Sequence, residues 1–168
     1  EFPFVKLAVF GDPEDPLFFT AYGRKAYRAK TGEEAWEIEA GRPNWVRTIR
    51  WDEQEPSGLL IGQEMEATLD GNYIGFPTIH VIDTDGQIVL EMTFPNDKQL
   101  TEVFTADLDG NGVESPILHF EANELRALFP DGSTRWETTV SIFANPVDHM
   151  LASHAVADID GDGKEEIL

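Results

Sequence analysis

Two short segments of the chain place oxygen-bearing side chains at alternate positions between glycines. In the second segment Asp158, Asp160 and Asp162 occupy positions 1, 3 and 5, and Glu166 occupies position 9. A tightly curled loop turns alternate side chains toward one centre, and its glycines permit the positive φ angles that the curl needs. Hard oxygen ligands in this number suit Ca²⁺ better than a transition metal. We therefore expect a calcium site here, with the backbone carbonyl of Lys164 at position 7 as a neutral ligand.

The first segment has the same spacing but fewer formal charges. Asp107, Asp109 and Asn111 stand at positions 1, 3 and 5, Ser115 stands at position 9, and Val113 offers the carbonyl at position 7. The number of charged ligands is one of the properties that set calcium affinity. We therefore expect a second calcium site here, with looser binding than in the later segment.

An EF-hand and a pair of solvated Asp-Gly turns are the alternatives to this interpretation. An EF-hand loop needs a bidentate Glu at position 12 and a helix on each side. Position 12 of the first segment is Leu118, and both segments follow β-type sequence. Solvated turns suit a lone Asp-Gly pair, but two carboxylates about 4 Å apart repel by roughly 1 kcal/mol in water and more in a less polar setting. Three carboxylates in one loop therefore favour a bound cation.

The metal-loop motif belongs to a longer repeat. The segment from Val103 to Gly112 recurs as His154 to Gly163, and each copy is an apolar run followed by an acidic glycine loop. The chain also contains three hairpin signatures, in each of which a glycine is followed four positions later by a large apolar residue and then by Glu. These pairs are Gly32 with Trp36, Gly86 with Leu90, and Gly132 with Trp136. A turn glycine between two alternating runs predicts a β-hairpin.

One unit of strand, loop, strand, strand, glycine turn and strand fills about 40 to 55 residues, which is the size of a propeller blade. The sequence therefore predicts an all-β fold, a single β-propeller segment over residues 1–168. The four-stranded antiparallel units are about 4–40, 44–95 and 100–143, and 150–168 begins a fourth. A sandwich is the rival fold, but it does not ordinarily repeat a loop and a hairpin in fixed order. Such a propeller cannot close by itself, so we expect further chain or another copy to complete it.

Composition limits the partners of the chain. Twelve basic and 32 acidic side chains give a net charge of −20, which opposes binding to nucleic acid and anionic lipid and favours cations. There is no cysteine, so disulfides and thiolate zinc sites are excluded. No apolar run is long enough for a membrane-spanning helix. The histidines are scattered, and we expect them to have ordinary surface or hydrogen-bonding roles. They are His80, His119, His149 and His154.

The tryptophans form two groups by position. Trp36 and Trp136 occupy equivalent places in their hairpins, so we expect both to pack between blades. Trp45 and Trp51 lie on either side of two arginines and are candidates for a ligand-binding platform that stacks on sugars.

The segment from Ala157 to Leu168 resembles the loops of FG-GAP or VCBS repeats, found in integrin alpha-subunit propellers and in secreted bacterial proteins. The hairpins around Gly32 and Gly132 look like the blade hairpins of quinoprotein-type propellers. The resemblance implies calcium binding by the acidic loops, between the first two strands of a blade, and an extracellular setting. At position 9 of the first segment the chain has Ser115, whereas that family has an acidic residue there. The implied side-chain ligands are Asp158, Asp160, Asp162, Glu166, Asp107, Asp109 and Asn111.

Two functions follow from these features. The first is a non-enzymatic extracellular module for adhesion, recognition or structural assembly, with calcium ions and a protein or glycan partner. The alternative is a sector of a secreted propeller enzyme, either a polysaccharide lyase or a quinoprotein dehydrogenase. A lyase needs basic and carboxylate groups that converge at the propeller axis, and a quinoprotein needs a large cofactor cavity. The sequence shows no motif of a hydrolytic triad, and basic residues are few, so the binding module is favoured.

Overall fold

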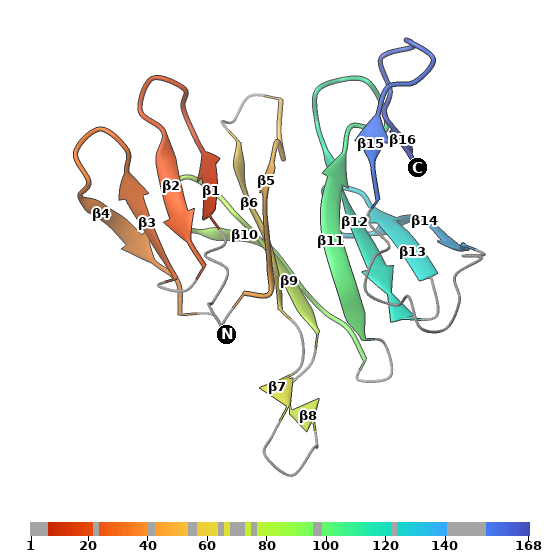
Figure 1. Cartoon of the computed structure of the whole chain (residues 1–168), viewed down its shortest axis with the longest axis horizontal. Coiled ribbons are helices and arrows are strands. Elements are labelled where there is room, and N and C mark those ends of the chain that lie inside the picture. Colours follow the sequence, from red (N-terminus) through yellow and green to blue (C-terminus); the bar gives the residue numbers. More distant parts are fainter. Residues whose placement is uncertain are drawn as a thin grey trace.

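The computed structural model of the chain is built from β-strands (Figure 1). It describes ten ranges of residues. Outside them lie His149 and residues 150–153, the first residues of the predicted fourth unit. The ranges are 7–21, 24–39, 43–53, 57–63, 66–67, 73–74, 77–95, 99–121, 124–140 and 154–168. In this part of the chain no helix could span a membrane.

Three four-stranded antiparallel sheets and one two-stranded sheet follow one another along the chain, and we call them blades 1 to 4. Blade 1 contains β1 (Leu7–Phe10), β2 (Leu17–Thr20), β3 (Lys25–Arg28) and β4 (Glu34–Glu37). Blade 2 contains β5 (Trp45–Ile49), β6 (Gly58–Gln63), β9 (Thr78–Ile82) and β10 (Ile88–Thr93). Blade 3 contains β11 (Leu100–Ala106), β12 (Ser115–Phe120), β13 (Glu124–Leu128) and β14 (Thr134–Thr139). Blade 4 contains β15 (Val156–Ala157) and β16 (Glu166–Ile167).

Each large blade is a meander in which every strand pairs with the next in order, and the first strand is the innermost. Strand β1 lies against β5, and β5 lies against β11, so the first strands of successive blades are neighbours, as Figure 1 shows. The predicted arrangement of three four-stranded antiparallel sheets and the beginning of a fourth is confirmed. A small ribbon of β7 (Glu66–Ala67) and β8 (Tyr73–Ile74) is inserted between β6 and β9, and no sequence pattern predicted it.

The apolar cores lie between blades. On β6, Leu59 and Ile61 join the core shared with blade 1, whereas Leu60 joins the core shared with blade 3. Alternate side chains of a strand point to opposite faces, so one short strand supplies two interfaces. All six residues of β12 are buried for the same reason. Stacked blades therefore explain why inner strands are apolar at consecutive positions.

The glycine turns predicted at three hairpins are present, and each glycine has a positive φ: 73° at Gly32, 82° at Gly86 and 81° at Gly132. At two of these glycines, a side chain of the preceding blade also lies close to the backbone of the turn. A Cβ on Gly86 would lie 2.8 Å from the ring of Trp36, whose Nε1–H donates to the carbonyl of Thr84 at 2.9 Å. A Cβ on Gly132 would lie 2.8 Å from Leu90. The turn of one blade thus covers the outer strand of the preceding blade, and Trp36 packs between blades as predicted.

A second contact recurs between blades, and we call it the latch. It joins the residue after the first strand of one blade to the residue before the second strand of the next. Between blades 1 and 2, the N–H of Gly11 donates to the carbonyl of Ser57 at 2.8 Å and also approaches its hydroxyl at 3.1 Å. This pair is the simplest of the three latches.

The other two latches use glutamate. The N–H of Arg50 donates to the Glu114 carboxylate at 2.6 Å, and the N–H of Glu114 returns a bond to the carbonyl of Arg50 at 2.8 Å. The N–H of Asp107 donates to the Glu165 carboxylate at 2.7 Å, and the N–H of Glu165 donates to the carbonyl of Asp107 at 2.9 Å. The Glu114 carboxylate also accepts a bond from the hydroxyl of Thr105 at 2.8 Å. Each glutamate therefore ties its own blade to the preceding one.

Replacing the turn glycine that faces Trp36 should cost more than replacing the one that faces open space. Gly86→Ala combines a left-handed backbone, which costs about 1–2 kcal/mol, with a clash against the indole. Gly32→Ala has the backbone cost alone, because its Cβ would meet no described atom within 4 Å. Urea unfolding should show a larger loss for Gly86→Ala by at least about 1 kcal/mol. Equal losses would contradict the close packing of turn and indole.

Removing a latch carboxylate should destabilise the chain. Glu114→Ala deletes the acceptor for the N–H of Arg50 and the hydroxyl of Thr105, and we expect a loss of about 1–3 kcal/mol in the free energy of unfolding. Glu121→Ala is the matched control, since Glu121 is exposed at the end of β12. Chemical denaturation of both variants measures the difference. A Glu114→Ala protein as stable as the control would show that the latch contributes nothing.

Candidate metal sites in the acidic loops

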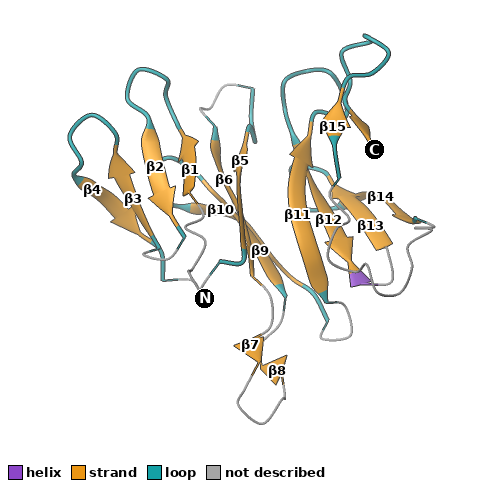
Figure 2. Ribbon diagram, viewed as in Figure 1, coloured by secondary structure: helices purple, strands orange, loops and turns teal. Residues whose placement is uncertain are grey.

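Both acidic segments form loops between the first two strands of a blade. Loop 1 (residues 107–114) joins β11 to β12, and loop 2 (residues 158–165) joins β15 to β16. Figure 2 shows the two loops at the same edge of the molecule. They touch there, because a Cβ on Gly110 would lie 2.7 Å from the carbonyl oxygen of Gly163. The repeat therefore places the two candidate sites beside each other.

Loop 2 brings three carboxylates together. One oxygen each from Asp158, Asp160 and Glu166 lies within 4.8 Å of the others. The Asp158 carboxylate accepts bonds from the N–H groups of Gly161 at 2.7 Å and Gly163 at 3.0 Å. Both glycines have positive φ, 80° and 90°, which the curl requires. Local backbone bonds thus hold the acidic side chains in place.

Asp162 is not one of these three clustered carboxylates, and it contacts Lys164. Its carboxylate accepts the backbone N–H of Lys164 at 2.9 Å and lies 3.3 Å from the Lys164 ammonium group. These contacts, the backbone bond first, lower the pKa of Asp162 below its ordinary value. Three of the four predicted carboxylates therefore converge, and the fourth is paired with a side chain of its own loop.

The residues of loop 2 fit a calcium ion. Asp158 and Asp160 are exposed, and Glu166 is half-buried at the start of β16. The Glu166 carboxylate accepts the N–H of Ile159 at 2.9 Å, which fixes it across the mouth of the loop. Three hard anionic oxygens on a curled backbone are the donor set that Ca²⁺ prefers.

Loop 1 repeats around Asp107 the backbone bonds that loop 2 forms around Asp158. The Asp107 carboxylate accepts the N–H groups of Gly110 at 2.8 Å and Gly112 at 2.7 Å, so both of its oxygens have backbone partners. The amide oxygen of Asn111 accepts the N–H of Val113 at 2.9 Å. Ser115 is buried in β12, where it pairs with Ala106. The two loops therefore share their backbone bonds, and loop 1 differs in having Asn111 at the position of Asp162 and the buried Ser115 at the position of Glu166.

An arginine that was not predicted from the sequence neutralises Asp109 in loop 1. The guanidinium of Arg135 on β14 bonds both oxygens of Asp109, at 2.6 and 2.7 Å. This bidentate pair lowers the pKa of Asp109 and raises that of Arg135. Arg135 stands three positions after its turn glycine, where the other two hairpins carry Ala35 and Val89. Arg135 is thus a charged residue at a hairpin position that is otherwise apolar, and this difference could have marked it as a functional residue from the sequence.

The candidate sugar-binding tryptophans lie at the junction of blades 2 and 3. Trp45 and Trp51 are both half-buried and pack against the same interblade core. A Cβ on Gly62 would lie 3.0 Å from the Trp45 ring, so the indole rests on the backbone of β6. Part of each ring is therefore used for packing, and sugar stacking by these residues stays a prediction.

Comparison with known proteins supports the architecture. No protein-family model and no curated protein matches the sequence. BBS1N, solved in complex with ARL6DN, is similar over 93% of this chain with a TM-score of 0.63 and 13% identity. The exotype rhamnogalacturonan lyase YesX is similar over 96% of this chain with a TM-score of 0.58 and 16% identity. The chain spans 46% and 38% of these two structures.

Both neighbours are β-propellers, and together with the stacked meanders they show that this chain has the β-propeller fold. At such low identity the similarity shows the fold alone. The resemblance of loop 2 to FG-GAP and VCBS repeats therefore stays a prediction that rests on the loop residues.

Breaking the Arg135–Asp109 pair should change the titration of loop 1. We expect Arg135→Gln to raise the pKa of Asp109 toward its ordinary value of 3.8, because the guanidinium bonds are lost. The pair lowers the pKa of Asp109 in the folded state. It therefore stabilises the fold at pH values above the ordinary pKa of this carboxyl group, and the stabilisation is lost as the pH falls through the lowered pKa. Carboxyl NMR titration measures the change, with Arg28→Gln in blade 1 as the control. An unchanged Asp109 titration in Arg135→Gln would contradict the assignment.

Proposed function

We propose that this chain is a calcium-binding β-propeller module that acts outside the cell in adhesion, recognition or structural assembly. The observation that carries the proposal is the convergence of Asp158, Asp160 and Glu166 in loop 2. Extracellular calcium is abundant enough to fill a site of modest affinity, which supports the proposed location.

Calcium in loop 2 would stabilise the junction of blades 3 and 4. Loop 2 packs on loop 1 through Gly110 and Gly163, and its last residue, Glu165, forms the latch to Asp107. An ion that fixes the curl of loop 2 also fixes both contacts. The proposed role of the metal is therefore structural, and it holds successive blades in register.

A protein partner is supported by an apolar pocket at the end of the repeat. The pocket has a volume of about 500 Å³ and is lined by Trp136, Leu125 and Ile167 among others. The equivalent residues of blades 1 and 2, Trp36 and Leu90, are covered by the glycine turn of the next blade. We propose that a hairpin from further chain or from another copy covers Trp136 in the same way and continues the propeller. BBS1N, whose fold is similar, was solved in a complex with another protein.

The binding module is favoured over a lyase because most described basic groups are already paired. A lyase needs free cationic groups at its substrate site. In the described part of the chain, many arginine and lysine side chains instead form ion pairs with carboxylates. They are Arg24, Lys25, Arg28, Arg47, Arg126, Arg135 and Lys164.

Calcium should raise the melting temperature through loop 2. A site with a dissociation constant of about 10⁻⁴ M adds roughly 1.4 kcal/mol at about 1 mM calcium. Asp160→Asn should abolish most of this gain, because it removes a charged ligand but keeps the oxygen that accepts the N–H of Asp162. Differential scanning calorimetry with calcium and with chelator measures the effect.

Asp131→Asn is the matched control for this experiment. Asp131 also lies in a glycine turn, where its carboxylate bonds Ser133, but it belongs to no described cluster of three acidic groups. We expect this variant to respond to calcium like the wild-type chain. A wild-type melting temperature that is the same with calcium and with chelator would refute the proposed function.

A further inference from the structure

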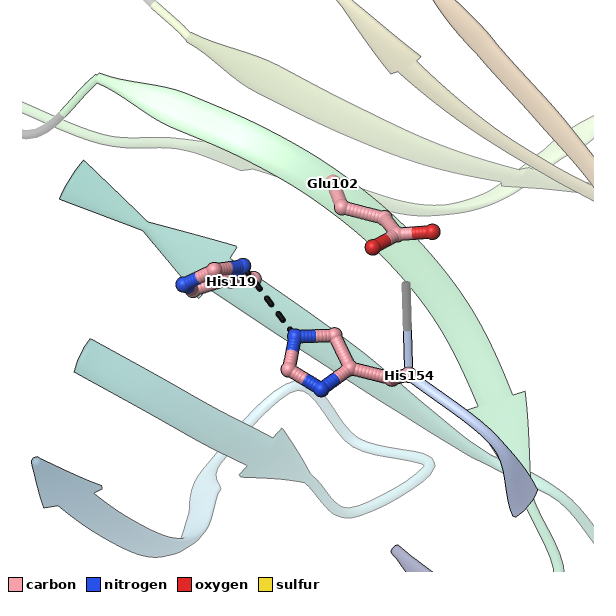
Figure 3. Close-up of side chains that lie close together, drawn as sticks. All are labelled: Glu102, His119 and His154. Atoms are coloured by element: carbon pink, nitrogen blue, oxygen red, sulfur yellow. Dashed lines mark hydrogen bonds between the residues drawn. The ribbon is translucent and has the colours of Figure 1, made fainter. Parts of the chain in front are cut away.

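Three side chains outside the acidic loops bring ligand atoms together on blade 3. Glu102 on β11 and His119 on β12 are direct cross-strand partners, so both point to one face of the sheet. His154, in the segment that leads into β15, reaches the same place, as Figure 3 shows. One ligand atom from each lies within 4.8 Å of the others. We propose that Glu102, His119 and His154 bind a transition-metal ion of the Zn²⁺ type that clamps blade 4 to blade 3.

The distance between the imidazoles fits a shared ion. Nδ1 of His119 and Nε2 of His154 are 3.2 Å apart. Two nitrogens bound to one tetrahedral zinc ion at about 2.0–2.1 Å stand about 3.3 Å apart. The metal can therefore replace the imidazole hydrogen bond with little movement of the rings. A carboxylate oxygen of Glu102 lies within 4.8 Å of a ligand nitrogen of each histidine. It must approach the nitrogens to about 3.3 Å, a movement of up to about 1.5 Å, which rotation of the Glu102 side chain allows.

The donor set selects the class of metal. Imidazole nitrogens suit zinc, copper, nickel and iron, whereas calcium and magnesium prefer sites made of oxygens alone. Two imidazoles and one carboxylate leave a fourth position for water or a partner's side chain. The site thus differs chemically from loop 2, and the two would take different ions from the same solution.

The surroundings hold the ligands in place. His119 is 8% exposed, and the hydroxyl of Thr101 donates to its backbone carbonyl at 2.9 Å. The ring of Phe104 stacks on His154, with centroids 5.0 Å apart and planes 24° from parallel. Aromatic packing and burial restrict both imidazoles, which lowers the cost of ordering them around an ion.

One competing contact comes from blade 2. A guanidinium nitrogen of Arg47 lies 3.7 Å from a carboxylate oxygen of Glu102, and the Arg47 side chain is 43% exposed. Exposed ion pairs at this distance contribute little, so the pair does not prevent Glu102 from turning to a metal. The cluster therefore lies where blades 2, 3 and 4 meet.

Calorimetric titration of the full chain with zinc chloride tests the proposal. The titration is run near neutral pH with about 1 mM calcium present, so that the oxygen site is occupied first. We expect one zinc site in the wild-type chain. His154→Gln and Glu102→Gln should each weaken binding by at least about tenfold, because each removes a direct ligand.

His80→Gln is the control, since His80 also faces a carboxylate, that of Glu91 at 3.3 Å, but belongs to no described three-ligand cluster. Its zinc affinity should equal that of the wild type. Cobalt is a second probe, because its visible absorption reports coordination by imidazole directly in each folded variant. The absence of a zinc site in the wild-type chain, or equal affinity in wild type and His154→Gln, would overturn the proposal and leave a hydrogen-bonded histidine pair.

Discussion

The arrangement of the blades depends on the latch between the first strand of one blade and the second strand of the next. Burial of apolar surface holds the blades together, but it is non-directional and would tolerate sliding or rotation. The latch adds backbone hydrogen bonds with fixed geometry at equivalent places, Gly11–Ser57, Arg50–Glu114 and Asp107–Glu165. Because latch residues flank the acidic loops, the same bonds that set blade register also set the position of each loop.

The two acidic loops show two ways to relieve crowded negative charge. In loop 1 the protein supplies the cation itself, since Arg135 reaches from the outer strand to both oxygens of Asp109. In loop 2, Lys164 is drawn to Asp162, and Asp158, Asp160 and Glu166 stay close together on the described surface. Carboxylates at this spacing repel one another, so a divalent ion is the natural counter-charge in a chain of net charge −20.

Local features could be predicted from the sequence, and contacts between blades could not. The turn at Gly86 follows from a glycine between two alternating runs, and the convergence of Asp158 with Asp160 follows from spacing within one loop. The bond from Arg135 to Asp109 joins residues that are near only after β14 pairs in its sheet. The cluster at His154 needs both the register of β11 with β12 and the stacking of blade 4. The β7–β8 ribbon was missed because two-residue strands carry no readable period.

The attachment of blade 4 explains why charge should matter most at this end of the repeat. A two-stranded sheet is marginally stable by itself, and blade 4 pairs Val156 with Ile167 and Ala157 with Glu166. Its apolar contribution to the core shared with blade 3 comes from Val156 and Ile167. The other described contacts are the latch through Glu165, the close approach of the two loops at Gly110, and the ring of His154, which bonds His119 and stacks on Phe104. A two-stranded blade with so small an apolar interface is more sensitive to bound cations than blades 2 and 3, whose strands β6 and β12 are buried at consecutive positions.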